Sequence, residues 1–216
     1  MDLAYGPEYE SFRAALRSFL AEHREQAPRA GFGEGVLSDP RQAAWQKLLI
    51  ERGYAARTIP KQYGGGGFAP DALLASILAE EFRRAGVPAG TSGQGPDMLV
   101  PTLLEHGTEE QKRRYVPPTV RGELIWCQGY SEPGAGSDLA SLTTQGRVDG
   151  DTLVVNGQKI WTSTAHVAQM MFALIRTEPD AQKHAGLSYL LIPMDTPGIE
   201  VRPLRTMTGH AEFNEV

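Results

Sequence analysis

The 216-residue sequence predicts an α+β protein, with an all-helical domain over residues 1–122 followed by an antiparallel β-barrel or sandwich domain over residues 123–216. Before residue 123 the apolar residues recur at the spacing of amphipathic helices. After it they alternate, or form short runs between Gly and Asp turns. With 41% hydrophobic and 22% charged residues, the composition is that of a globular protein.

The first three expected helices show packing patterns and no chemistry. The helix over 8–26 places apolar residues such as Leu16 and Phe19 on one face and turns Arg13 away from it. Ser38-Asp-Pro40 offers a cap and a first-turn proline for the second helix, which Gly53 ends. The third helix, from 71 to about 84, is apolar around much of its circumference and is expected to be buried.

Two more helices complete the first domain. Residues 54–69, with four consecutive glycines, are interpreted as a flexible surface turn, because no Gly-Lys-Ser/Thr follows to make a phosphate loop. A fourth helix is expected over about 95–106. Thr108 to Gln111 form a capping box for a fifth helix, which is expected to stop before Pro117.

From Leu124 onward the hydrophobic period changes to two. The strand candidates are 124–130, 141–148, 152–162, 167–176, 187–193 and 199–205. Asn156-Gly157 is either a tight turn or a bulge inside a longer ribbon. Short strands without intervening helices predict the antiparallel barrel or sandwich.

Charge and cysteine content exclude several classes of protein. A net charge of −5 offers no basic stripe for nucleic acid, and the single Cys127 allows no disulfide framework. No apolar run is long enough for a membrane span, and the first residues lack the pattern of a signal peptide. A cytoplasmic location is therefore expected.

The stretch from Trp126 to Asp138 has the residues of a binding turn. Pro133 fixes φ, and Gly134 and Gly136 permit φ values that other residues resist. The hydroxyls of Ser131 and Ser137 add hydrogen-bonding groups that suit a polar ring or a phosphate. A solvated turn is the other interpretation.

A second stretch, Asn156 to Ser163, follows a strand-like run. Trp161 and Ser163 are two positions apart and would point to the same face of a strand. An indole beside a hydroxyl can cover and hydrogen-bond one heterocycle, although an isolated tryptophan more often serves core packing.

Together these stretches resemble the acyl-CoA dehydrogenase family, which carries Thr/Ser-Glu-Pro-x-Ala-Gly-Ser-Asp and then Asn-Gly-x-Lys-x-Trp-x-Thr/Ser. Pro60 to Gly67 and His106 to Lys112 also look like family segments. The resemblance implies a helical domain and a β middle domain with a flavin cleft between them, followed by a C-terminal helical bundle. The chain is expected to be truncated before that bundle.

The resemblance implies FAD-dependent α,β-dehydrogenation of an acyl-CoA thioester to a 2,3-enoyl-CoA. A general base removes the α proton as the β hydride passes to the flavin. The implied electron acceptor is an electron-transfer flavoprotein, and the full-length protein is expected to be a homo- or hetero-oligomer. No catalytic residue is nominated, because the family's base is a glutamate of the C-terminal domain. The chain alone is therefore expected to be inactive.

Two alternatives to this function stay open. One is an acyl-CoA oxidase or flavin monooxygenase of the same fold. The other is a non-catalytic subunit that binds acyl-CoA or contributes only structure to a heteromeric complex.

The resemblance also assigns site residues. The flavin contacts are Gln128, Gly129, Tyr130, Ser131, Gly136, Ser137, Trp161, Thr162 and Ser163. Ser131 and Ser163 are the implied donors to the isoalloxazine ring, and Ser137 also contacts the CoA arm. Met98, Leu99 and Thr102 are candidates for the substrate tail or, equally, for core packing. Glu132 is expected to hold the turn, and no metal ligand is nominated.

Overall fold

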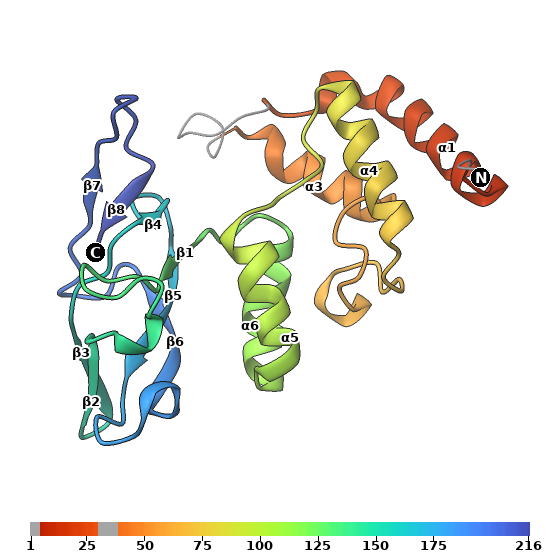
Figure 1. Cartoon of the computed structure of the whole chain (residues 1–216). Helices are drawn as coiled ribbons and strands as arrows, with labels where there is room; N and C mark the ends of the chain where they lie inside the picture. The colour runs from red at the N-terminus through yellow and green to blue at the C-terminus, as the bar shows by residue number, and fades with distance from the viewer. Residues whose placement is uncertain (1–4, 30–38) are drawn as a thin grey trace. The chain divides into compact units, whose positions relative to one another are not determined.

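A computed structural model describes residues 5–29 and 39–216, which divide into two compact units, residues 1–123 and 124–216 (Figure 1). Ser38, assigned above to a helix cap, lies outside the described residues. In the described parts of the chain, no helix has the length and apolar character that crossing a membrane requires.

The first unit is helical. Its α-helices are α1 (Pro7–His23), α3 (Arg41–Glu51), α4 (Ala72–Ala85), α5 (Val100–His106) and α6 (Glu109–Val120), and a π-helical segment, Gln94–Leu99, leads into α5. Short 3-10 turns follow α1 (Arg24–Gln26) and precede α4 (Lys61–Tyr63). A buried core joins α1, α3 and α4 through Leu16, Phe19, Trp45, Leu49, Ile77 and Phe82. The expected helical domain is confirmed.

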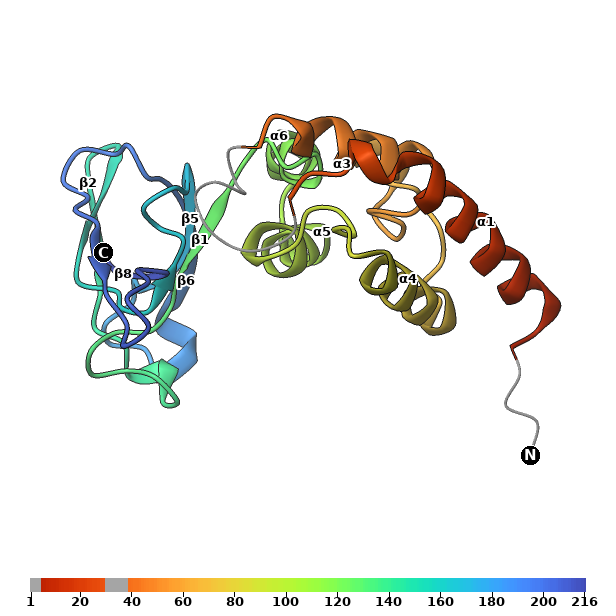
Figure 2. The same cartoon turned by 90° about the horizontal axis from the view of Figure 1, so that it is seen from above.

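Helix α1 packs beside α4 through an ion cluster (Figures 1 and 2). The Arg13 guanidinium donates to Glu80 and to Glu81, in each case at 2.7 Å, and Arg17 donates to both carboxylate oxygens of Glu81. Arg13 is 7% exposed, so the expectation that it turns away from the packed face is wrong. The reason is that a carboxylate on the neighbouring helix pairs with it, which periodicity within α1 cannot reveal.

Helix α4 begins where the Asp71 carboxylate accepts hydrogen bonds from the N–H groups of Leu73 and Leu74. Ile77 and Phe82 are buried, whereas Leu73 is 42% exposed. Within the described residues α4 is thus amphipathic, and the expected burial holds for one face of the helix only.

The glycine-rich loop differs from the expected flexible turn. The N–H of Gly66 donates to Ala56, and that of Gly67 donates to Ile59 over 2.8 Å. A Cβ at Gly65 would lie 2.3 Å from the Ile59 carbonyl oxygen, so glycine is needed for close backbone approach. The four glycines therefore build a compact, hydrogen-bonded loop.

Helix α6 has the expected capping box, since Thr108 and Gln111 exchange side-chain and backbone hydrogen bonds. It does not stop before Pro117 but continues through Pro118 to Val120. The helix ends beyond the prolines, where the N–H of Arg121 donates to Pro117 and Gly122 adopts a φ of 74°. Each proline removes one intrahelical N–H donor, and the helix continues through both despite that cost.

The second unit contains two open sheets, and no helix separates its strands except short 3-10 turns. Strands β1 (Trp126–Gly129), β2 (Gln145–Asp149), β3 (Thr152–Asn156), β5 (Met170–Arg176) and β6 (Leu187–Pro193) form one sheet. Strands β4 (Thr162–Ser163), β8 (Phe213–Glu215) and β7 (Arg202–Leu204) form the other, in that order. The helical unit comes first in the chain and the β unit second, as expected.

The larger sheet is mixed rather than purely antiparallel. Strand β5 pairs antiparallel with β6 along one edge, and along the other edge it pairs parallel with β1 and, through Gln145 and Arg176, with β2. The β2–β3 hairpin turns at Gly150, which has a φ of 61°. Parallel pairing joins segments that are far apart in the chain, so turn residues in the sequence do not predict it.

The strand expected over 152–162 is divided into β3 and β4. Asn156 still pairs with Gln145, and Gly157 has neither a positive φ nor a turn role. A Cβ at Gly157 would lie 2.3 Å from Oγ1 of Thr144. The glycine therefore serves close packing where the chain leaves one sheet for the other, which is neither the tight turn nor the bulge considered above.

Candidate functional site

The candidate site is built around the turn at residues 131–138. Glu132 and Ala135 exchange backbone hydrogen bonds of 2.8 and 3.1 Å, and these close the turn. Gly134 and Gly136 are exposed and have no positive φ, and a Cβ at either would meet nothing within 4 Å. Neither backbone conformation nor packing in the described chain requires glycine there. Bare backbone at such a place suits close approach by a ligand.

The carboxylate of Glu132 holds this turn against the segment that enters β2. Its Oε2 accepts from the N–H of Thr143 (2.6 Å) and from the Thr143 hydroxyl (2.8 Å), and its Oε1 accepts from the N–H of Thr144 (2.9 Å). Burial alone raises the pKa of Glu132, but the hydrogen bonds from Lys159 and the two threonines outweigh it and bring the pKa to about 2. The residue is 6% exposed and ionised at neutral pH.

The ammonium of Lys159 donates to three acceptors. They are Oε1 of Glu132 at 2.8 Å, the carbonyl of Leu174 in β5 at 2.7 Å and the carbonyl of Tyr130 at 3.1 Å. Lys159 is 4% exposed, and burial lowers its pKa while Glu132 opposes that change. An ammonium has three N–H donors, and here each one has an acceptor.

The two motifs meet through the backbone as well. The N–H of Ile160 donates to the carbonyl of Ser131 over 2.9 Å, and Lys159 exchanges backbone hydrogen bonds with Val216. Ser131, from the turn, and Trp161, from the second motif, are thus brought into one region by consecutive residues of the segment 159–161.

Trp161 is 60% exposed and has a left-handed backbone with a φ of 60°. It lies outside β4, so the expectation that a regular strand places it on one face with Ser163 is wrong. Its ring meets the ring of Phe213 edge to face, with centroids 6.0 Å apart. An exposed indole on a backbone conformation that costs energy for a non-glycine residue is a feature typical of ligand sites.

Thr162 and Ser163 form β4 beside β8. Thr162 is fully buried, its carbonyl accepts from Asn214 Nδ2 at 2.9 Å, and its Oγ1 has no hydrogen-bond partner in the described chain. Ser163 is half-buried and pairs with Phe213. Of these two residues, Ser163 is the one whose side chain has access to the surface.

Three of the remaining expected flavin contacts, Gln128, Gly129 and Tyr130, lie in or next to β1. Gly129 is packed so closely that a Cβ would lie 2.6 Å from the sulfur of Met171. The ring of Tyr130 lies 5.8 Å from that of Phe172 and 6.5 Å from that of Tyr189, so it packs over β5 and β6. Gln128 is half-buried, and Ser137 is exposed in the turn.

The expected substrate contacts lie in the helical unit, in and after the π-helical segment. Leu99 is fully buried in the unit, and Met98 is 43% exposed. The hydroxyl of Thr102 donates to the Met98 carbonyl at 2.8 Å. Met98 is therefore the most accessible of the three side chains.

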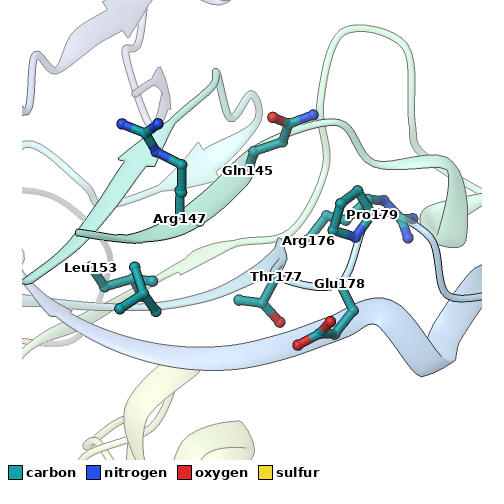
Figure 3. A pocket seen from close by; sticks show the side chains of 9 residues that line it. Gln145, Arg147, Leu153, Arg176, Thr177, Glu178 and Pro179 are labelled. Atoms are coloured by element: carbon teal, nitrogen blue, oxygen red, sulfur yellow. The ribbon is translucent and has the colours of Figure 1, made fainter. Parts of the chain in front are cut away.

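A hollow elsewhere in the β unit does not coincide with these residues. It is lined by β2 and by residues 176–179 (Figure 3). The guanidinium of Arg176 donates to the carbonyls of Ala140 and Leu142 and so supports the chain after the turn. Within residues 5–29 and 39–216, no group of three or more His, Cys, Asp or Glu side chains is placed to hold a metal ion.

Lys159 lies inside the second motif, and no role was predicted for it from the sequence. One feature of the sequence could have indicated a role. Lys159 is a cation in a segment expected to be a strand, and the acidic Glu132 in the other motif is available to pair with it. Lysine and glutamate are seldom fully buried unless they pair.

Family models match both units. Residues 6–123 match the acyl-CoA dehydrogenase N-terminal domain, and residues 127–215 match the acyl-CoA dehydrogenase middle domain. The chain is 45% identical over 215 residues to acyl-CoA dehydrogenase IpdE1 of Mycobacterium tuberculosis, covering 97% of this chain and 55% of that protein. It is 49% identical over 177 residues to acyl-CoA dehydrogenase FadE34 of the same organism, covering 79% of this chain and 24% of that protein.

Solved structures agree with these matches. The Tcur3481-Tcur3483 steroid ACAD has a TM-score of 0.75 at 34% identity and is matched over 100% of this chain and 55% of that one. The ChsE4-ChsE5 complex from Mycobacterium tuberculosis has a TM-score of 0.75 at 35% identity, over 100% of this chain and 54% of that one. The chain therefore spans about half the length of IpdE1 and of these two structures.

Proposed function

Because the chain belongs to the acyl-CoA dehydrogenase family, we propose that it supplies one wall of the flavin site of an enzyme that converts an acyl-CoA thioester to a 2,3-enoyl-CoA. The observation that supports this most directly is the hydrogen bond from Ile160 to Ser131, because it joins the two motifs that the proposal needs in one place.

The residues present fit a planar aromatic cofactor such as FAD. An exposed indole at Trp161, half-buried hydroxyls at Ser131 and Ser163, and open backbone at Gly134 and Gly136 offer a ring cover, donors and room for close approach. A bound flavin would supply the acceptor for the substrate's hydride.

In the proposed reaction the chain's own residues bind and orient. The Ser131 and Ser163 hydroxyls donate hydrogen bonds to the ring edge, and the Trp161 indole covers a ring face and excludes water. Ser137 contacts the CoA arm, and Met98 contacts the acyl tail. Glu132 is not the base that removes the α proton, because its carboxylate is buried and already accepts four hydrogen bonds.

The names of two structural neighbours bear on substrate and assembly. One is a steroid ACAD and the other is a two-component complex. We extend both features to this protein and propose a CoA thioester with a bulky ring-bearing tail as substrate and a hetero-oligomer as the working form. The proposed electron acceptor, an electron-transfer flavoprotein, rests on the family resemblance alone.

The test uses the full-length protein, expressed alone and with candidate partner subunits. Bound FAD is measured from its visible absorption after gel filtration. Anaerobic bleaching of the flavin is then followed with straight-chain and steroid-derived acyl-CoA esters. Failure to retain FAD in every combination would refute the proposal. Turnover with rapid oxygen consumption would favour the oxidase instead.

A further inference from the structure

We propose that the buried Lys159–Glu132 ion pair is a positioning device that sets Ser131 relative to Trp161, and thereby the shape of the flavin site. This inference rests on the proposed function. It assigns a role to two residues that do not themselves touch the cofactor.

The geometry places Ser131 at the centre of the pair's hydrogen bonds. The ammonium of Lys159 binds the carbonyl of Tyr130 and the carboxylate of Glu132, the residues before and after Ser131. The next residue along, Ile160, binds the carbonyl of Ser131 itself. The three consecutive residues from Tyr130 to Glu132 are thus held by two consecutive residues that directly precede Trp161.

The same ammonium also anchors this assembly to the sheet. Its shortest hydrogen bond, 2.7 Å, goes to the carbonyl of Leu174 in β5. The turn and the 157–161 segment both lie outside regular strands, where backbone position is otherwise weakly determined. Lys159 therefore fixes the positions of these two loop segments relative to strand β5.

Stability alone is a weak reason for such a pair. The side chains of Lys159 and Glu132 are only 5% and 4% exposed, and taking two charges out of water offsets most of their attraction. Well-packed apolar residues commonly stabilise a core as well. A buried pair whose ammonium binds the Tyr130 and Leu174 carbonyls and the Glu132 carboxylate gives precise geometry, and binding sites need side chains held to within about 0.5 Å.

The test compares variants of the full-length protein. Lys159→Met retains a long side chain and removes the ammonium. FAD affinity is measured by titrating apoprotein, and the visible spectrum of bound flavin and the thermal unfolding temperature are recorded in parallel. The dissociation constant for FAD is expected to rise about tenfold or more, with a shifted visible spectrum. Ile175→Val is the control, because Ile175 is fully buried in β5 and its side chain takes no part in these hydrogen bonds. It should lower the unfolding temperature and leave the FAD constant and spectrum unchanged.

Two further variants separate positioning from stability. Glu132→Gln with Lys159→Met removes both charges, so the unfolding temperature should recover toward wild type while FAD affinity stays weak. Glu132→Asp keeps the charge but withdraws the carboxylate by one methylene, so it should shift the flavin spectrum even if Lys159→Met does not fold.

The outcomes distinguish the two proposals. If wild-type protein binds FAD and the double variant and Glu132→Asp both retain its affinity and spectrum, the positioning role is wrong and the proposed function stands. If wild-type protein binds no FAD under any condition, the proposed function fails, and the positioning role fails with it.

Discussion

The backbone N–H of Ile160 lies 2.9 Å from the carbonyl oxygen of Ser131, and this single bond links two motifs that the β2–β3 hairpin separates in the chain. It brings the residue before the exposed Trp161 against the first residue of the Pro-Gly turn.

Trp161→Ala is expected to separate binding from stability. The indole is 60% exposed, so its removal should change the free energy of unfolding by less than about 1 kcal/mol. Loss of the ring cover should weaken FAD binding in the full-length protein. Met207→Ala, at another exposed apolar side chain, should change neither quantity. Unchanged FAD affinity in Trp161→Ala would contradict the assigned role.

Gly136→Ala and Gly157→Ala are expected to have opposite effects on stability. A Cβ at Gly136 meets open space and no positive φ, so alanine should stabilise the fold by about 0.5 kcal/mol. A Cβ at Gly157 would collide with Thr144, and that variant should lose about 2 kcal/mol. Urea unfolding measures both. Gly136→Ala should also weaken FAD binding, and an unaltered FAD constant would show that the turn's open backbone does not approach the cofactor.

The loss of stability at acid pH is expected to be smaller in Lys159→Met than in the wild type. In the wild type, the pKa of Glu132 falls from its ordinary 4.5 to about 2, so its contribution is present above pH 4.5 and is lost as the pH falls toward 2. Within the described residues, Lys159 is the charged group bonded to Glu132, alongside the two threonines.

Without the ammonium, only the threonine hydrogen bonds oppose burial, so the pKa of Glu132 should rise from about 2 toward its ordinary 4.5. The free energy of unfolding of Lys159→Met should then depend less on pH in this range. Chemical denaturation of both proteins between pH 7 and about pH 4 tests it. Parallel profiles for the two proteins would show that the ion pair does not control the ionisation of Glu132.

Arg13→Met is expected to destabilise the helical unit more than Arg202→Met destabilises the β unit. Arg13 is buried between α1 and α4 and pairs with Glu81, which is 2% exposed and would lose one of its two arginines. The side chain of Arg202 is 60% exposed in its pairs with Glu200 and Glu215. Unfolding midpoints in urea measure the difference, and equal losses would contradict it.

Local pattern was sufficient for much of the fold. The helical period, the Asp71 and Thr108 caps and the alternation after residue 124 predicted five helices and most strands close to their observed places. Those features depend on residues only a few positions apart, so they can be predicted from the sequence. The local pattern did not predict the continuation of α6 through Pro117 and Pro118, because a proline marks a frequent helix boundary but not an obligatory one.

The candidate site, like the fold, was predictable from the sequence only in part. Residue types along the chain were enough to single out the Pro-Gly turn and Trp161 and to associate them with one heterocycle. The left-handed backbone of Trp161, the parallel β1–β5 pairing and the burial of Lys159 against Glu132 came only with the folded chain. Each of these depends on segments that are distant in sequence and meet through hydrogen bonds and desolvation, and no local spacing encodes which buried charge will find which partner.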